Sequence, residues 1–125
     1  VYKHSQDRKT FGQRLIDHQA YRWELAKMAT NIQASQAFVD ACIMEKVAGT
    51  LDEVTGAMAK YQTTELQIEV VNEALQLHGG YGYMAEYGVE KVLRDLRVHQ
   101  ILEGTNEVMR MIIARHLLNS EEQLR

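Results

Sequence analysis

Two long runs of helical periodicity, separated by one short connection, constrain the fold of this chain most strongly. Over residues 17–47, apolar side chains recur at spacings of three, four or seven, at Tyr21, Leu25, Met28, Ile32, Val39 and Cys42. Residues 50–77 show a second apolar face with Leu51, Val54, Met58, Tyr61, Ile68, Val71 and Leu75. The pattern predicts an antiparallel hairpin of two helices, each about 40 Å long, which must bury its apolar faces on further helices.

The ends of these two helices are predicted from residues that favour helix termini. Asp17 is predicted to cap the first helix, because a short acceptor side chain binds the free backbone N–H groups at a helix start. Gly49 is predicted to end it, since glycine enters the left-handed backbone region without a steric penalty. Thr50, with Glu53 three residues later, forms a capping-box pattern for the second helix, which is predicted to stop at residues 79–80.

The rest of the chain is predicted to contain a glycine-rich turn at residues 79–83 and two further helices. One runs over roughly residues 89–99, and the last begins at Thr105. The chain has no proline and only 7% aromatic residues, which favours helices over strands. We therefore predict a single all-α domain over residues 1–125, an up-down four-helix-type bundle. Because the sequence does not begin with Met, we expect a fragment of a larger protein.

Charge and hydropathy argue against several functional classes. The formal net charge of −3 is mixed along the chain without a basic stripe, so no nucleic-acid partner is expected. No apolar run approaches about 20 residues, so no membrane span is expected. The amino-terminal segment lacks the apolar core of a signal peptide, and a single cysteine, Cys42, cannot form an internal disulfide. We therefore expect a protein that is not secreted and works in a reducing compartment.

A metal site is not expected either. A di-iron site in a helical bundle needs Glu-x-x-His pairs on facing helices, and the sequence has no such pair. The five histidines lack the spacing of metal ligands. His78 and His99 are interpreted as packing or hydrogen-bonding residues.

Three clusters at predicted helix ends contain residues that can carry chemistry, and each also has a simpler structural explanation. Arg8, in "DRKTFG", is a solvated charge or an anion contact. The glycines of "QLHGGYGY" (residues 76–83) cap a helix, or they let backbone N–H groups approach a phosphate or sugar closely. Glu103, in "ILEGTNEVMR", stabilises a helix N-terminus by about 0.5 kcal/mol, or it acts as a base.

Taken together and in order, these clusters give the chain its resemblance to a known family. The sequence resembles the C-terminal helical domain of acyl-CoA dehydrogenases over nearly its whole length. The resemblance is carried by "DRKTFGQRLIDHQ" (7–19), "QLHGGYGYMAEYGVEKVLRD" (76–95) and "RVHQILEGTNEVMRMIIAR" (97–115). Within the family, the last segment looks most similar to isobutyryl-CoA dehydrogenases and other short-chain or branched-chain members.

The resemblance implies a reaction and a base. Family members oxidise an acyl-CoA thioester to the 2,3-enoyl-CoA with bound FAD, and the position matching their catalytic carboxylate is Glu103. The thioester oxygen is held there by the backbone N–H of this residue and by a flavin ribityl hydroxyl, as in an oxyanion hole. Gly104 is expected to leave room for substrate, and Ile101 and Leu102 are expected to keep the site dry. Substrate binding that expels water would raise the pKa of the base. Arg115 is expected to lie near substrate or to support the site.

The resemblance also implies contacts to FAD. Arg8 matches an arginine that binds the pyrophosphate, for which its planar fork is suited. The other expected FAD contacts are Phe11, His18 and Gln19 around the adenosine half, Gln76, Leu77, His78, Gly79 and Gly80 at the dinucleotide, and Thr105, Asn106 and Glu107 after the base. Many relatives carry Gln where this chain has Glu107. Thr105 is also expected to cap the last helix.

The family's assembly implies partners and limits. Family members are homodimers or homotetramers in which the arginine and glycine segments reach a neighbouring subunit's flavin, while the glutamate serves its own. Electron-transfer flavoprotein is the expected acceptor, and the bacterial cytoplasm or the mitochondrial matrix the expected location. Relatives also carry an N-terminal helical domain and a middle β-domain, so the isolated chain is expected to be inactive. Two alternatives stay open: a non-catalytic helical oligomerisation module, and a domain of an acyl-CoA oxidase.

Overall fold

The computed structural model describes residues 1–123, with side chains to residue 119, and is dominated by helices. Two long helices, α2 (Gln19–Ala48) and α3 (Glu53–His78), are followed by α5 (Val89–Arg97) and α6 (Asn106–Gln123). The shorter elements are α1 (Tyr2–Asp7), strands β1 (Lys9–Thr10) and β2 (Gln13–Arg14), α4 (Gly80–Tyr83), and the 3-10 turns η1 (Leu15–Asp17), η2 (Ala85–Tyr87) and η3 (Val98–Gln100).

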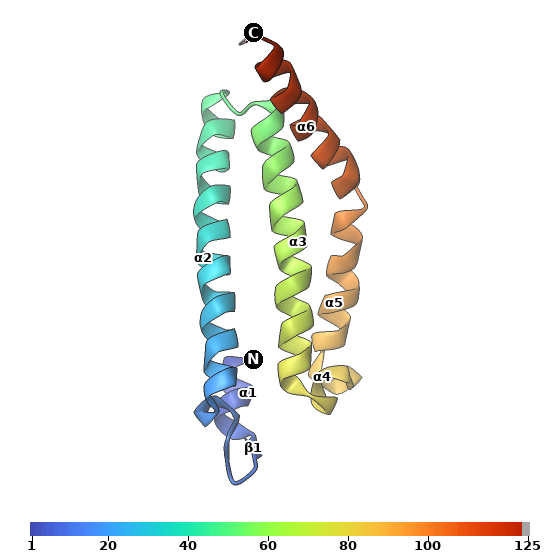
Figure 1. Ribbon diagram of the computed structural model, residues 1–125. Coiled ribbons are helices and arrows are strands. Elements are labelled where there is room, and N and C mark those ends of the chain that lie inside the picture. The colour runs from blue at the N-terminus through green and yellow to red at the C-terminus, as the bar shows by residue number, and fades with distance from the viewer. Residues whose placement is uncertain (124–125) are drawn as a thin grey trace.

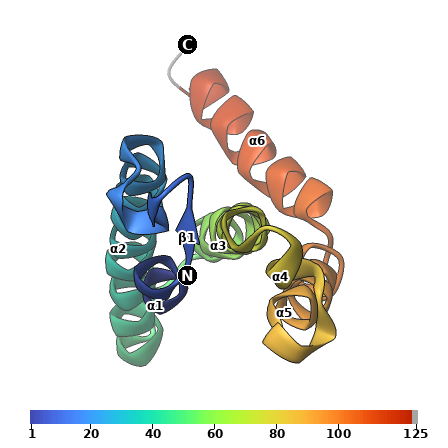
Figure 2. The same ribbon diagram turned by 90° about the horizontal axis from the view of Figure 1, so that it is seen from below.

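Helix α3 is the centre of the fold. It packs against α2 on one side and against α5 and α6 on the other (Figure 1). The chain runs up through α2, down through α3 and up again through α5 and then α6, which confirms the predicted all-α, up-down arrangement. Seen along the helices, α2, α3 and α5 lie in a row and α6 diverges from α5 (Figure 2). The four helices therefore form an open layer with α3 at its centre.

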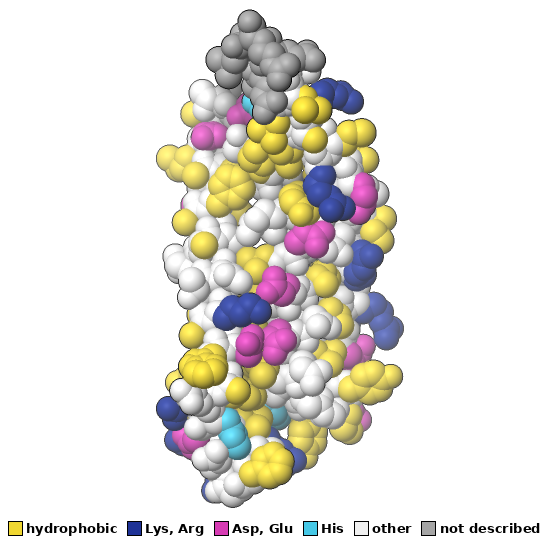
Figure 3. Space-filling view, in the orientation of Figure 1, with side chains coloured by type: hydrophobic (Ala, Val, Ile, Leu, Met, Phe, Trp, Pro, Cys, Tyr) yellow, Lys and Arg dark blue, Asp and Glu magenta, His cyan; other side chains and the backbone are white. Residues whose placement is uncertain are grey.

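This open layer leaves much apolar surface uncovered. The apolar side chains that are buried are those of Tyr21, Met28, Cys42 and Ala57. Many larger ones are exposed, and hydrophobic side chains are spread over the face shown in Figure 3. Ile32 and Met58, predicted to lie on buried faces, are among the exposed ones. An apolar helix face must be buried against another element, so the chain by itself only partly meets the expectation that its apolar faces are covered.

The start of α2 differs from the prediction. His18, not Asp17, is the N-cap residue, and it makes no side-chain capping bond. The Asp17 carboxylate instead accepts hydrogen bonds from Arg14 Nε at 2.9 Å and Nη2 at 3.0 Å, and lies 3.5 Å from Arg22 Nη2. Two guanidinium groups thus compete for the acceptor, and these charge-assisted bonds are stronger than a neutral cap. The predicted end of α2 at Gly49 is confirmed, with φ +74°.

The start of α3 also differs. Asp52 is the N-cap: its carboxylate accepts from Thr55 N at 2.8 Å and from Thr55 Oγ1 at 2.6 Å. Thr50, the predicted cap, belongs to the end of α2, where its backbone N–H bonds to Glu45 O at 2.9 Å and its hydroxyl donates to the same carbonyl at 3.3 Å. The capping box predicted at Thr50 and Glu53 is therefore wrong, because closing α2 occupies the threonine.

The remaining corner is more helical than predicted. The expected glycine turn at 79–83 contains one left-handed glycine, Gly79, and then the helical turn α4. Gly82 is fixed by packing, since a Cβ there would lie 2.5 Å from Leu75 O. Helix α5 ends at Arg97, and η3 continues it. The sequence patterns did not predict α1 or the hairpin of β1 and β2, in which Lys9 pairs with Arg14 and Thr10 with Gln13.

Candidate functional site

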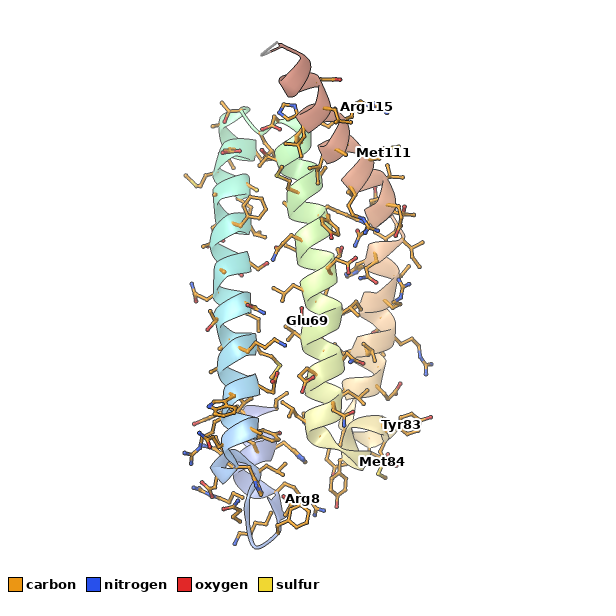
Figure 4. The ribbon with its side chains drawn as sticks, viewed as in Figure 1. Arg8, Glu69, Tyr83, Met84, Met111 and Arg115 are labelled. Atoms are coloured by element: carbon orange, nitrogen blue, oxygen red, sulfur yellow. The ribbon has the colours of Figure 1, made fainter. Side chains whose placement is uncertain are left out.

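Two segments far apart in the sequence meet at one end of the helical layer. A pocket of about 630 Å³ lies there between the segment after α1 and the end of α3. The predicted FAD-binding residues that line it are Arg8, Gln76, Leu77, His78, Gly79 and Gly80. Arg8 and Met84, another lining residue, both lie at this end of the molecule (Figure 4). The structure thus brings the predicted arginine and glycine clusters together.

Glycine leaves the wall of this pocket open. Gly79 ends α3 with φ +61° and ψ −143°, a conformation that side chains with a Cβ rarely adopt. A Cβ built on Gly79 or Gly80 would meet no atom within 4 Å, so the space beside this backbone is free. A ligand can therefore approach the main chain directly.

Arg8 supplies the pocket with positive charge. Its guanidinium lies over the ring of Tyr81, 5.0 Å from the ring centre. Among the described side chains, no carboxylate lies within ion-pair distance of it. Across the pocket, Tyr21 Oη donates to Leu77 O at 3.0 Å and holds the end of α3 against α2. The result is an uncompensated cation beside open backbone, which suits an anionic ligand.

His78 forms the back of the pocket and has a structural partner. Its Nδ1 donates to Ala74 O at 2.6 Å, and its ring stacks on that of His4 with centroids 4.4 Å apart. The rings of Tyr81 and Tyr87 lie edge-to-face with the His4 ring, with ring centroids 6.1 and 6.4 Å from its centroid. His4 Nε2 is buried without a hydrogen-bond partner. The interpretation of His78 as a packing residue and its place on the pocket wall are therefore compatible.

His4 is expected to make the protein less stable at acid pH. Burial and then the nearby positive charges of His78, the amino terminus and Arg8 lower its pKa from 6.5, with Asp7 acting in the opposite direction. The unfolded chain then takes up a proton that the folded state disfavours, so this contribution is fully present above pH 6.5 and is lost as the pH falls. Urea unfolding from about pH 7 to pH 5 should show a shallower decline for His4→Phe; parallel curves would contradict this.

The other predicted residues of the amino-terminal segment lie outside this pocket. Phe11 is at the exposed tip of the hairpin with φ +52°, and its ring meets His18 edge-on at 6.4 Å. The His18 ring is held by Thr10 Oγ1 at 3.1 Å and Gln13 Nε2 at 2.9 Å. Gln19 is exposed in the first turn of α2. None of the three is among the residues that line the pocket.

Glu103 lies in a separate loop between η3 and α6. Its φ of +56° is left-handed, a conformation that costs a residue with a Cβ about 1–2 kcal/mol. Gly104 follows with φ +85°, and a Cβ there would lie 2.8 Å from Met109 Cε. Glu103 itself is exposed. The loop therefore presents a carboxylate on a sharp, strained turn that glycine completes.

The apolar pair before Glu103 does not shield it in this chain. Ile101 is 54% exposed and Leu102 41% exposed. Among the described residues, no element covers this side of the loop, so in this chain the pair does not exclude water from Glu103. Any desolvation of Glu103 has to come from a covering partner or ligand.

The residues after Glu103 are tied to α3 or to each other. The backbone N–H of Val108 bonds to Thr105 Oγ1 at 3.4 Å, as expected for a cap. Asn106 is 2% exposed, and its amide bonds to Thr64 and Glu65, so its side chain faces α3. The Glu107 carboxylate accepts from its own backbone N–H and from Thr105, which lowers its pKa. Because its side chain faces α3, Asn106 could contact a ligand only through its backbone.

The two clusters are well separated along α3. The Glu103 loop contacts α3 at Lys60, whereas the glycine pocket begins near Leu77, which places them about 25 Å apart along the helix. Arg115 lies on α6 about 14 Å beyond Asn106, exposed and towards the opposite end from Arg8 (Figure 4). One chain therefore carries two separate clusters of predicted site residues, the Arg8 pocket and the Glu103 loop, and Arg115 belongs to neither of them.

Sequence reasoning missed three residues around these two clusters. Tyr21 and Tyr81 shape the glycine pocket, and Lys60 binds the Glu103 loop. Tyr21 was assigned to the apolar face, where its hydroxyl was the only signal of a polar role. Within the described residues, no group of three or more His, Cys, Asp or Glu side chains could hold a metal ion. No described helix is both long enough and apolar enough to cross a membrane.

Comparison with known proteins identifies the family. Residues 1–118 match the family described as "Acyl-CoA dehydrogenase, C-terminal domain". The chain belongs to the acyl-CoA dehydrogenase family. This confirms the resemblance inferred from the three sequence motifs, and the helical fold is the one expected from it.

Two curated relatives and one solved structure illustrate the similarity. Over 112 residues, the chain is 43% identical to the mitochondrial long-chain specific acyl-CoA dehydrogenase of Rattus norvegicus, covering 90% of this chain and 26% of that protein. It is 44% identical over 112 residues to the mitochondrial isobutyryl-CoA dehydrogenase of Bos taurus, covering 89% and 27%. The crystal structure of acyl-CoA dehydrogenase from Geobacillus kaustophilus matches with a TM-score of 0.90 and 44% identity, over 93% of this chain and 30% of that one.

The extent of these matches sets what the family assignment covers. The chain spans about a quarter of the length of the two curated acyl-CoA dehydrogenases. An isobutyryl-CoA dehydrogenase is among the matches, as the motifs predicted, and a long-chain enzyme is similar to nearly the same degree. Sequence identity in this domain therefore does not select an acyl chain.

Proposed function

We propose that this chain is the FAD-binding and base-carrying C-terminal domain of a longer flavoenzyme, an acyl-CoA dehydrogenase that converts an acyl-CoA thioester to the 2-enoyl-CoA. The observation that carries the proposal is the convergence of Arg8 and residues 76–80 on one pocket, with Glu103 on a strained loop of the same chain. The isolated chain is expected to be inactive, since it corresponds to about a quarter of its curated relatives.

The glycine pocket fits FAD in its charge and its shape. Arg8, unpaired by any described carboxylate, would hold the pyrophosphate, and Gly79 and Gly80 would let the dinucleotide lie against backbone. Phe11 and His18, whose rings contact each other outside the pocket lining, would contact the adenosine half. When bound, FAD accepts the hydride that leaves the β-carbon of the substrate.

Glu103 would remove the α-proton of the substrate. An α-proton beside a thioester is weakly acidic, so the carboxylate needs a site that excludes water and the developing oxyanion needs a donor. The left-handed turn at Glu103 and Gly104 keeps the carboxylate and the backbone N–H of Glu103 on an exposed loop, open to substrate. Binding of the acyl chain against Ile101 and Leu102 would supply the desolvation that the chain alone lacks.

The separation of the two clusters supports a shared arrangement between subunits. We propose that Arg8 and residues 76–80 serve one flavin and that Glu103 serves another, in a homodimer or homotetramer. The exposed apolar side chains and a groove of about 290 Å³ between α2 and α3, lined by Ile32, Val39, Leu66 and Val71 among others, offer surface for such contacts.

Mixing two inactive variants tests this sharing. At an FAD concentration that leaves the Arg8→Gln oligomer without FAD, Arg8→Gln and Glu103→Gln enzymes are each expected to be inactive. Hybrids of the two should regain activity, because one of their sites combines an intact Arg8 from one subunit with an intact Glu103 from the other. If both clusters served the same flavin in one chain, hybrids would stay inactive.

The function itself is tested by product analysis of the full-length enzyme. A panel of acyl-CoAs, differing in chain length and branching, is incubated with the enzyme and either electron-transfer flavoprotein or oxygen. The expected product is the acyl-CoA lacking two hydrogen atoms, formed faster with the flavoprotein acceptor. Faster turnover with oxygen would favour an acyl-CoA oxidase, and no product with any substrate would favour the oligomerisation module.

For location, the bacterial cytoplasm or the mitochondrial matrix remains our proposal, supported by the two mitochondrial relatives.

A further inference from the structure

Lys60 links the loop that carries Glu103 to the central helix. It lies on α3, partly buried, and its Nζ donates to Gly104 O at 2.8 Å and to Asn106 Oδ1 at 2.7 Å. These two acceptors lie on either side of Thr105, the residue that caps α6. One ammonium group thus holds both the turn after Glu103 and the start of the following helix.

Asn106 extends this connection into a buried network. Its Nδ2 donates to Thr64 Oγ1 at 2.9 Å and to Glu65 Oε1 at 2.7 Å. The Thr64 hydroxyl lies 2.8 Å from Lys60 O, so it closes the network back onto α3. Because Asn106 is 2% exposed, its polar atoms depend on these partners for their hydrogen bonds.

The turn that this network holds would not be expected to form by itself. Glu103 and Gly104 have consecutive positive φ angles, and Glu103 is not a glycine. Strained conformations of this kind persist when the surrounding structure over-determines them. Among the described side chains, Lys60 is the one that bonds to the backbone of this turn, at the carbonyl oxygen of Gly104.

We propose that Lys60 is a positioning residue for Glu103. By fixing the Gly104 carbonyl and Asn106, it sets the direction of the Glu103 carboxylate and of its backbone N–H. The inference rests on the proposed role of Glu103 as the base. It predicts that loss of Lys60 misplaces the base and leaves FAD binding intact, since the glycine pocket lies about 25 Å away along α3.

The test compares Lys60→Met with Lys60→Arg in the full-length enzyme, with Lys91→Met as control. Lys91 is an exposed lysine that pairs with Asp95 on α5. Lys60→Met is expected to lower kcat about 10- to 100-fold, with KM and FAD content within about threefold of wild type, because small misplacements of a catalytic group have effects of this size. Lys60→Arg, which keeps charged donors, should recover much of the loss, and Lys91→Met should behave as wild type.

A second readout does not depend on turnover. Hydrogen–deuterium exchange of peptides covering residues 99–111 should become faster in Lys60→Met, with residues 76–83 unchanged. If Lys60→Met fails to fold, Lys60→Gln carries the same comparison, because its side chain stays polar but lacks the ammonium charge. Wild-type kcat together with unchanged exchange in the folded variant would overturn the proposal. An inactive wild-type enzyme would instead count against the proposed function, and the exchange result would still decide the role of Lys60.

Discussion

Replacing Glu103 with Gln is expected to lower turnover of acyl-CoA by the full-length enzyme about a thousandfold, because general-base catalysis contributes factors of this order. Gln keeps the size of the side chain and removes its ability to take a proton. The strained backbone at φ +56° is unaffected by this change, so the fold and the FAD content should stay as in wild type. The measurement is steady-state kcat with the best acyl-CoA of the panel.

Glu45→Gln is the matched control for this substitution. Glu45 is an exposed acid near the end of α2, far in the chain from the Glu103 loop, and it does not line the glycine pocket. Its replacement should leave kcat unchanged. If Glu103→Gln kept more than about a tenth of wild-type turnover, the base would have to be another group.

Replacing Arg8 with Gln should weaken FAD binding about 10- to 100-fold, the range expected for loss of hydrogen bonds to a charged group. The structure motivates this through an arginine that lines the pocket and has no carboxylate partner among the described residues. Lys9→Gln is the control, since Lys9 is the adjacent exposed cation on β1 and does not line the pocket. The measurement is the Kd of FAD for apoenzyme, by flavin fluorescence.

Salt adds a check on the charge that Arg8 provides. Raising the ionic strength should weaken FAD binding to wild type more than to Arg8→Gln, because partly exposed charges are screened. Equal affinities for wild type and Arg8→Gln would show that the dinucleotide lies elsewhere. In that case the glycines at the end of α3 would serve only to cap the helix, which is the simpler explanation of the glycine-rich segment.

The long helices could be predicted from the sequence because their signals are repeated many times. Most turns of α2 and α3 add an apolar residue in phase, and Gly49 ends α2 and so separates the two helices. Single-residue signals were less reliable. Asp17 and Thr50 are both good capping residues. However, Asp17 binds Arg14 and Arg22, and Thr50 bonds to the last turn of α2. Such competition is decided by three-dimensional neighbours and does not appear in a linear pattern.

For the candidate site, too, some features could be predicted from the sequence and others could not. Motif resemblance brought Arg8 and Gly79 to attention, and the fold then placed them in one pocket. It did not indicate that Asn106 turns its side chain towards α3, or that Ile101 lies exposed. Lys60 was missed because a single lysine in a helix has no periodic signal. Its contact with Gly104 joins residues 44 apart in the sequence and depends wholly on how α6 packs against α3.

The central claim is that this chain supplies Glu103 and the Arg8 pocket to an acyl-CoA-oxidising flavin site. Anaerobic titration of the FAD-loaded full-length enzyme with the acyl-CoA panel, followed by flavin absorbance, tests it most directly. We predict bleaching of the oxidised flavin by at least one acyl-CoA in the wild-type enzyme, with bleaching slowed about a thousandfold in Glu103→Gln. A flavin that no acyl-CoA bleaches, or equal bleaching in Glu103→Gln, would contradict the account.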